Sequence, residues 1–273
     1  MFLYVGKMKS VRSAGFFLSI FFMGVALIAT FWLPTDILDY QIQDRLQAPN
    51  SVHFLGTDHL GRDILSMLMA GTTNSLGIAI VAVLLGSSIG FFLALLVWVL
   101  QISWLNRTIF YFSDSLLAFP VLLTALILAT FYRPGLLNVI IAIALYNIPI
   151  FIRLTDTTLH AISKNSYIKA AFAMGQTRSG MLWKHMIHSL APIGVVQITV
   201  QISFALLAEA GLSYLGFGIT YPQTSWGKML FDGQTFIEDY PWLVIWPGLC
   251  MTLAVLGFQL LGEWLRKNLD IPS

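Results

Sequence analysis

Long apolar runs constrain this 273-residue chain more than any other feature of its sequence. A membrane-spanning helix needs about 20 consecutive apolar residues, because it rises about 1.5 Å per residue through about 30 Å of hydrocarbon. Six runs approach or exceed that length, at residues 14–33, 76–100, 109–131, 135–152, 187–215 and 243–261. The first run is longer than the apolar part of a signal peptide and lacks a small-residue cleavage site, so we expect it to be retained. We predict an all-α, polytopic membrane protein with six transmembrane helices.

Composition supports an integral membrane protein and excludes other classes. Hydrophobic residues make up 57% of the chain and charged residues only 10%, whereas soluble domains carry about 25% charged residues. The net charge is +2 and no Lys/Arg-rich run is present, so we expect the lipid bilayer and no nucleic acid as a partner. The single cysteine, Cys250, excludes an intrachain disulfide and a cysteine-based metal cluster.

The distribution of Lys and Arg predicts which side of the membrane each loop faces. Six spans place both termini on the same side, and basic residues concentrate in cytoplasmic segments. With the N-terminus inside, inner segments hold eleven of the fifteen basic residues, and the outer segments hold the other four, Arg45, Arg62, Arg133 and Lys228. We therefore predict a multi-pass protein with both termini in the cytoplasm.

One polar, basic interval, residues 167–192, lies between the fourth and fifth runs on the predicted cytoplasmic side. Its pattern predicts two short helices hinged at Gly175, since glycine suits the left-handed residue that ends a helix. Helical spacing places four residues on one narrow apolar face that another protein can approach closely, namely Tyr167, Ala170, Ala171 and Met174. The alternative is an ordinary cytoplasmic loop lying on its own bundle.

A second motif lies in the polar, acidic segment between the first two runs, on the predicted outer side. It reads HFLGTDHLGRD from His53 to Asp63. Its glycines mark turns, and Thr57 and Asp58 are able to cap a short helix. The residues that we assign to this motif are Gly56, Thr57, Asp58, Gly61, Arg62 and Asp63. Imidazole and carboxylate groups also bind nickel or zinc, so a metal site that includes His53 and His59 is a weaker alternative.

Polar and helix-breaking residues inside the apolar runs are candidates for a translocation path or gate. Glu209 lies in the fifth run, where a carboxyl group is costly enough to indicate function. It either lines such a path or bonds to a neighbouring helix near the outer interface. Pro120 interrupts the third run and is predicted to bend it, while Asn147 lies in the fourth run. We take Glu209, Asn147 and Pro120 as the candidates.

Three stretches resemble the permease subunits of ATP-driven (ABC) importers. Ala170 and Ala171, then Gly175, then Pro192 resemble the cytoplasmic "EAA" loop of that family. The outer motif resembles the LGTD, two residues, GRD signature of its peptide and nickel branch, and residues 207–218 resemble its AEA, then LSFLGLG, sequence. Lys169 stands where the family usually has glutamate, and His188 stands where near relatives often have proline.

The resemblance implies a MetI-like permease architecture and a set of partners. The loop around Ala170 would be the coupling helix that sits in a cleft of an ATPase subunit. A second homologous permease subunit, two ATPase subunits that bind ATP and magnesium, and an external substrate-binding protein would complete an importer in the cell inner membrane. Residues 1–72 would form an N-terminal span with an external loop, and residues 73–273 a five-helix permease core.

The chain itself carries no phosphate-loop motif, so we expect no ATPase activity and no cofactor of its own. The branch carries dipeptides, oligopeptides, nickel and metal chelates. Residues 138–145 and 246–249 look closest to nickel permeases, so we favour nickel or a nickel chelate over short peptides. A secondary transporter or channel that uses an ion gradient through Glu209 is the alternative function, and a membrane scaffold without transport is a third.

Overall fold

Helices joined by turns make up the computed structural model, which describes residues 2–131 and 135–269. Arg133, one of the four basic residues predicted on the outer side, lies outside these ranges. The elements are α1 (Phe2–Phe31), η1 (Ile42–Asp44), α2 (Ile64–Leu100), α3 (Ser103–Ala118), α4 (Val121–Phe131), α5 (Leu136–Ser163), α6 (Ser166–Ala173), α7 (Arg178–Met181), η2 (Leu182–Met186), α8 (Ile187–Tyr214), α9 (Trp226–Gly233), η3 (Gln234–Phe236) and α10 (Trp242–Asn268). The predicted all-α class is confirmed.

Within the described ranges, five helices are long and apolar enough to cross a membrane, and a bent pair forms a sixth candidate span. The five lie in α1, α2, α5, α8 and α10, with the span of α8 beginning in α7. The bent pair is α3 with α4, which meet at 90° around Phe119 and Pro120. Proline lacks the amide that continues a helix and disfavours helical geometry in the residue before it. The sequence predicted one bent helix over residues 109–131, whereas the structure starts earlier and contains two separate helices.

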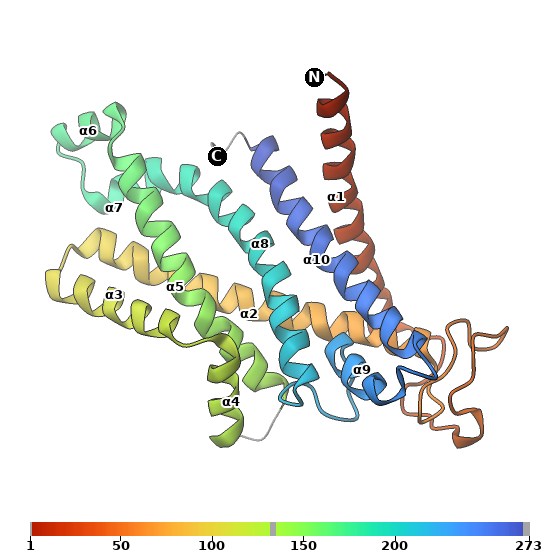
Figure 1. Ribbon diagram of the computed structural model, residues 1–273. Coiled ribbons are helices and arrows are strands. Elements are labelled where there is room, and N and C mark those ends of the chain that lie inside the picture. Colours follow the sequence, from red (N-terminus) through yellow and green to blue (C-terminus); the bar gives the residue numbers. More distant parts are fainter. Residues whose placement is uncertain (1, 132–134, 270–273) are drawn as a thin grey trace.

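α2 is the longest of the described helices and lies at the centre of the packing. In Figure 1 it crosses behind α5, α8 and α10, and it contacts all three. Two glycines bring it close to α5, because a Cβ at Gly86 would lie 2.5 Å from the carbonyl oxygen of Ala144, and a Cβ at Gly90 would lie 2.6 Å from that of Ile148. Small residues of this kind let membrane helices pack closely. α1 packs along α10.

Short elements gather at the two ends of α2. Near its C-terminal end, Trp98 shares a buried apolar cluster with Ile168 of α6 and Met181 of α7. Near its N-terminal end, Gly71 lies against Trp226 of α9, next to the segment that joins α1 to α2. The first turn of α1 and the last turn of α10 point toward the end of the bundle that carries α6 (Figure 1). The bundle therefore has one end with α6 and α7 and an opposite end with α9 and the loop before α2.

Candidate functional site

The candidate coupling loop begins with α6, which is anchored along one side. Ile168 and Ala171 are buried there, in the same apolar cluster as Trp98 of α2 and Leu159 of α5. Asn165 occupies the N-cap position, although its side chain makes no capping hydrogen bond. The inner side of α6 is therefore fixed to the ends of two membrane helices.

The other side of α6 is open. Tyr167 is 50% exposed and Met174 is 74% exposed, and Ala170 and Lys169 are also exposed. The sequence placed Ala171 on the same face as Ala170, but the structure turns Ala171 inward against the bundle. The available face is thus narrower than predicted and consists of Tyr167, Ala170 and Met174.

A glycine separates α6 from the next helix. Gly175 has a φ of +79°, the left-handed conformation that the sequence predicted for the hinge. A Cβ at this position would meet nothing within 4 Å, so the need for glycine comes from the backbone conformation and not from crowding. Thr177 then caps α7, since its hydroxyl accepts a hydrogen bond from the amide of Gly180 at 3.2 Å. The guanidinium of Arg178 lies 5.5 Å from the ring centre of Trp98, which ties this second turn to α2.

Between α7 and α8 the chain passes through η2, a π-helical turn at Leu182–Met186. Such turns are rare and frequently occur at functional sites. The apolar pattern of the sequence does not reveal this turn, because a single π turn shifts the helical register by only one residue. Leu182 and Met186 are buried in the cluster under α6, so the turn leads directly from the loop into α8.

Glu209 is fully buried in α8, near the end that carries α9. Its carboxyl oxygens accept hydrogen bonds from the hydroxyl of Ser75 at 2.9 Å and from that of Ser213 at 2.7 Å. The Ser75 oxygen also accepts a hydrogen bond from the backbone amide of Trp226 at 3.2 Å, and Asn74 donates to the carbonyl of Thr224 at 2.7 Å. This buried network joins α2, α8 and the start of α9, and Glu209 borders no open path in this structure.

The other two path candidates lie elsewhere. Asn147 of α5 is buried against α2, where its Cβ would be 2.6 Å from a Cβ at Gly86, and its amide donates to the carbonyl of Ile143 at 2.8 Å. Gly86 follows Ser75 by eleven residues, about 16 Å along α2, so Asn147 and Glu209 do not share a site. Pro120 is exposed at the break between α3 and α4. The structure does not bring the three candidates together.

The outer motif folds into a tight turn held by a buried ion pair. Arg62 and Asp58 are 6% and 5% exposed, and the Arg62 Nη2 atom lies 2.6 Å from the Asp58 Oδ2 atom. The other carboxyl oxygen of Asp58 accepts hydrogen bonds from the amides of Leu60 and Arg62 at 2.9 and 2.8 Å. The two charges are therefore paired, and both carboxyl oxygens of Asp58 have partners within the turn.

Asp63 ends the motif as the N-cap of α2. Its carboxylate accepts from both the amide and the hydroxyl of Ser66, at 2.8 and 2.9 Å. The sequence assigned capping to Thr57 and Asp58, whereas Thr57 is buried in the turn and forms a β-bridge with Asp63. Gly56 and Gly61 have φ values of +83° and +81°, so both positions need glycine.

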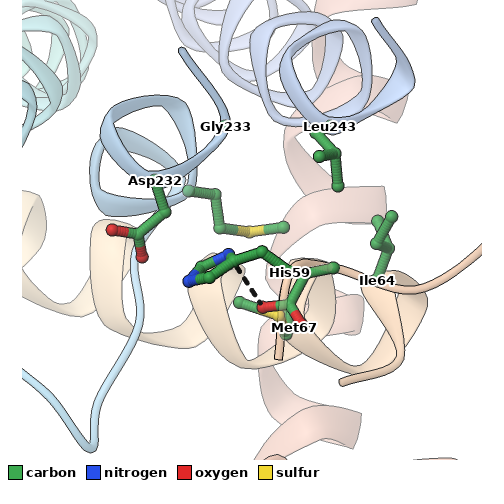
Figure 2. Close-up of a pocket in the computed structure, with 8 residues that line it drawn as sticks. His59, Ile64, Met67, Asp232, Gly233 and Leu243 are labelled. Atoms are coloured by element: carbon green, nitrogen blue, oxygen red, sulfur yellow. Dashed lines mark ion pairs between the residues drawn. The ribbon is translucent and has the colours of Figure 1, made fainter. Parts of the chain in front are cut away.

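The two histidines of the motif have partners in the protein. His53 Nδ1 lies 3.0 Å from Asp63 Oδ1, and His59 Nδ1 lies 3.9 Å from Asp58 Oδ2. Figure 2 shows the His59 ring under α9, on the side of Asp232. In the described part of the chain, His, Cys, Asp and Glu side chains do not form a group of three able to hold a metal ion. A cleft of about 240 Å³ next to His59 is lined by residues of the motif, of the segment before α9 and of α9 itself, namely His59, Leu60, Arg62, Tyr221, Gln223, Thr224, Lys228 and Asp232.

Sequence reasoning missed one charged pair that joins two membrane helices. Asp114 of α3 and Arg153 of α5 form an ion pair, and their side chains are 54% and 53% exposed. Asp114 lies inside the predicted third span, so the reasoning that selected Glu209 would have found it. Arg153 was counted as a cytoplasmic residue because it follows the fourth apolar run directly.

Comparison with known proteins places this chain in a family. Residues 86–271 match the family described as binding-protein-dependent transport system inner membrane component. The chain is 35% identical to the dipeptide transport system permease DppC of Alkalihalophilus pseudofirmus, over 97% of this chain and 86% of the relative. It is 36% identical to the glutathione transport system permease GsiD of Pectobacterium atrosepticum, over 94% and 85%, and 32% identical to the nickel transport system permease NikC of Escherichia coli, over 90% and 88%. The chain belongs to this permease family.

Solved structures show the same fold for this permease. A structure titled as an inward-facing conformation of the MetNI methionine ABC transporter matches with a TM-score of 0.63 at 19% identity, over 77% of this chain and 98% of the other. A second crystal form of that transporter matches with a TM-score of 0.61. The likeness confirms the predicted MetI-like architecture.

Family membership settles several predictions about this permease. It is a multi-pass inner-membrane subunit of a binding-protein-dependent ABC importer of the peptide and nickel family. ATP hydrolysis lies on partner subunits, and the family implies an ATPase and a binding protein as partners. These findings replace the alternative of an ion-gradient-driven transporter that uses Glu209.

Proposed function

We propose that this permease forms half of a transmembrane pathway and that α6 transmits motion to it from an ATPase subunit. A second homologous permease forms the other half, two ATPase subunits bind below, and an external binding protein delivers the cargo. The observation that carries the proposal is the two-sided character of α6. Its outer face, Tyr167, Ala170 and Met174, is free for a partner, while its inner face is packed on the bundle.

The packing of α6 explains how a local movement reaches the membrane. Its buried side chains share one cluster with Trp98 at the end of α2, Leu159 near the end of α5, and Met186 directly before α8. Side chains in a close-packed cluster shift together, because interiors are not freely deformable. A partner that pulls α6 would therefore displace the ends of three spans at once.

The same proposal includes the orientation of the permease in the membrane and the division of the chain at residue 72. The bias of basic residues supports cytoplasmic termini and a cytoplasmic α6. Residues 1–72 supply the peripheral span and the outer loop, and residues 73–273 supply the core. α2 runs from Ile64 to Leu100, so this boundary lies inside a continuous helix and the two parts move as one unit there.

The cargo that we propose is a short peptide, with a nickel complex as the second candidate. Relatives that are 35% and 36% identical are named as dipeptide and glutathione permeases, which supports a peptide. A nickel permease that is 32% identical over 90% of this chain supports the second candidate, as do the stretches that favoured nickel in the sequence.

Substitution on the outer face of α6 tests the coupling. Ala170→Asp places a charge where a close apolar contact is proposed, so we expect the amount of ATPase that co-purifies with the permease pair to fall at least about tenfold. Ala161→Asp is the matched control, because Ala161 is equally small and exposed but lies on α5 outside the loop. Thermal unfolding of both variants verifies that the permease itself is intact. Equal recovery of the ATPase with both variants contradicts the proposal.

A further inference from the structure

The ion pair between Asp114 and Arg153 is unusual for its exposure. Each side chain is more than half exposed, and the two residues come from different membrane helices, α3 and α5. A charged group on a spanning helix is costly in lipid and normally faces the bundle interior or a water-filled cavity. The exposed surface around this pair is therefore not expected to face acyl chains.

The pair lies within two candidate membrane spans, inside the ends of both helices. Arg153 precedes the end of α5 by ten residues, about 15 Å along the helix, and Asp114 follows the start of α3 by eleven residues, about 16 Å. Trp104, 68% exposed in the first turn of α3, is the kind of residue that marks the membrane interface. Asp114 lies ten residues beyond it, about 15 Å deeper along the helix.

Most exposed side chains beside the pair are polar, with Phe112, 53% exposed, as an apolar exception. Several accompany the pair along the two helices, Arg107, Tyr111 and Ser115 on α3 and Thr157 and His160 on α5. The exposed residues of α2 around Ile89 are instead mostly apolar, as expected for contact with lipid, and include Leu84, Leu85, Ile89 and Phe92, with Ser88 as the polar exception. The bundle thus has a lipid-type surface and a separate polar surface, which we call the α3–α5 polar stripe.

We propose that Asp114 and Arg153 line the aqueous translocation path, on a surface that faces the second permease subunit. The inference rests on the proposed function, because the second subunit closes the path on that side. The pair gives the path a wall with one carboxylate and one guanidinium, which suits a hydrophilic cargo that carries charges of both signs. It also connects α5, whose end lies under α6, to α3 and the break at Pro120, so movement of α6 reaches the bent span through this contact.

Cysteine accessibility tests the proposal in the assembled importer. The background is Cys250→Ser, which removes the single native thiol. Asp114→Cys and Ser115→Cys probe the polar stripe, and Ser115→Cys leaves the ion pair intact in case loss of Asp114 perturbs folding. Ile89→Cys is the depth-matched control, since Ile89 is 44% exposed and precedes the end of α2 by eleven residues.

Inside-out vesicles that contain the permease co-expressed with its partner subunits are treated with a charged, lipid-insoluble methanethiosulfonate. Thiols react as thiolates, which form in water and not in lipid, so we expect labelling at 114 and 115 at least about tenfold faster than at 89. All three variants should label equally after denaturation in detergent. Rates at 114 and 115 as slow as at 89 overturn the proposal.

Labelling rates measured with and without nucleotide distinguish the path lining from the coupling role of α6. If α6 couples ATP binding to the path, a non-hydrolysable ATP analogue should change the labelling rates at 114 and 115 and leave the rate at 89 unchanged. Fast labelling that does not respond to nucleotide supports the path and contradicts the coupling role of α6. Slow labelling at both positions with and without nucleotide contradicts the path lining, whatever the ATPase does.

Discussion

Ionisable residues on the membrane helices follow two different patterns. Glu209 is fully enclosed and receives hydrogen bonds from Ser75 and Ser213, so its burial is compensated by polar neighbours on two helices. Asp114 and Arg153 instead compensate each other and remain half exposed. A buried group held in this way stabilises a contact between helices, whereas a half-exposed pair needs water or another chain beside it.

Replacement of Glu209 should loosen the end of the bundle that carries α9. Glu209→Ala leaves the hydroxyls of Ser75 and Ser213 without their acceptor, which should lower the free energy of unfolding by about 1–3 kcal/mol. Thermal unfolding of the purified permease pair and hydrogen exchange around Trp226 measure the effect. Glu209→Gln is the control, because its amide oxygen still accepts a hydrogen bond, so its loss should be smaller. Equal stability of Glu209→Ala and the unaltered protein would rule out this structural role.

Loss of Arg62 should be more damaging than loss of other outer basic residues. Arg62→Ala leaves the buried carboxylate of Asp58 unpaired, which costs about 3–5 kcal/mol of stability when a buried pair is broken. Arg45→Ala is the control, since Arg45 lies exposed in the same outer segment. Expression level and thermal unfolding of the two variants should differ clearly, and similar values would contradict the structural role of the pair.

At the scale of elements, close contact between α2 and α5 depends on two glycines. At both positions, a Cβ atom would lie too close to a carbonyl oxygen of α5 for any side chain to fit. Gly77 lies in the same helix but faces open space, so its small size serves no packing purpose in this subunit. The four-residue spacing of Gly86 and Gly90 is typical of a small-residue packing face, and the structure places both residues against α5.

Gly86→Val should push α2 away from α5. Overpacking of a tight interface costs about 1–3 kcal/mol, so we expect a lower Tm and reduced recovery of the permease. Gly77→Ala is the control and should leave Tm unchanged or raise it slightly, because alanine favours a helix over glycine. A Tm for Gly86→Val equal to that of Gly77→Ala would show that the helices are not in close contact.

At the scale of the whole molecule, α2 links the two functional ends. Its first residue follows the cap formed by Asp63, and Trp98 near its last turn packs under α6. A 37-residue helix is about 55 Å long, so it reaches from the outer motif to the loop that carries α6. The outer motif, the contact with α5 and the cluster under α6 therefore all adjoin one continuous helix.

Uptake assays should identify the cargo of the complete importer. Cells that express the permease with its partners and binding protein should accumulate a radiolabelled dipeptide above cells that carry Ala170→Asp, because we expect that variant to release the ATPase. The same cells tested with radioactive nickel should show no such difference. Nickel uptake that depends on an unaltered Ala170, without dipeptide uptake, would establish the second candidate instead.

The sequence by itself determined the membrane class, the approximate spans and the glycine hinge at Gly175. These features are local, because entry of a segment into lipid depends on its own apolarity, and a left-handed backbone at a hinge favours glycine whatever surrounds it. The sequence also revealed the family resemblance, because the motifs that carry it are short and contiguous.

Only the tertiary structure decided which face of each helix is buried and which polar groups meet. Ala171 turns inward because α2 and α5 lie behind α6, and Glu209 is satisfied because Ser75, more than a hundred residues earlier in the chain, lies beside it. The 90° break between α3 and α4 and the pairing of Asp114 with Arg153 likewise depend on how separate helices pack. Periodicity within one segment carries no information about these contacts, because each is made with residues from a distant part of the sequence.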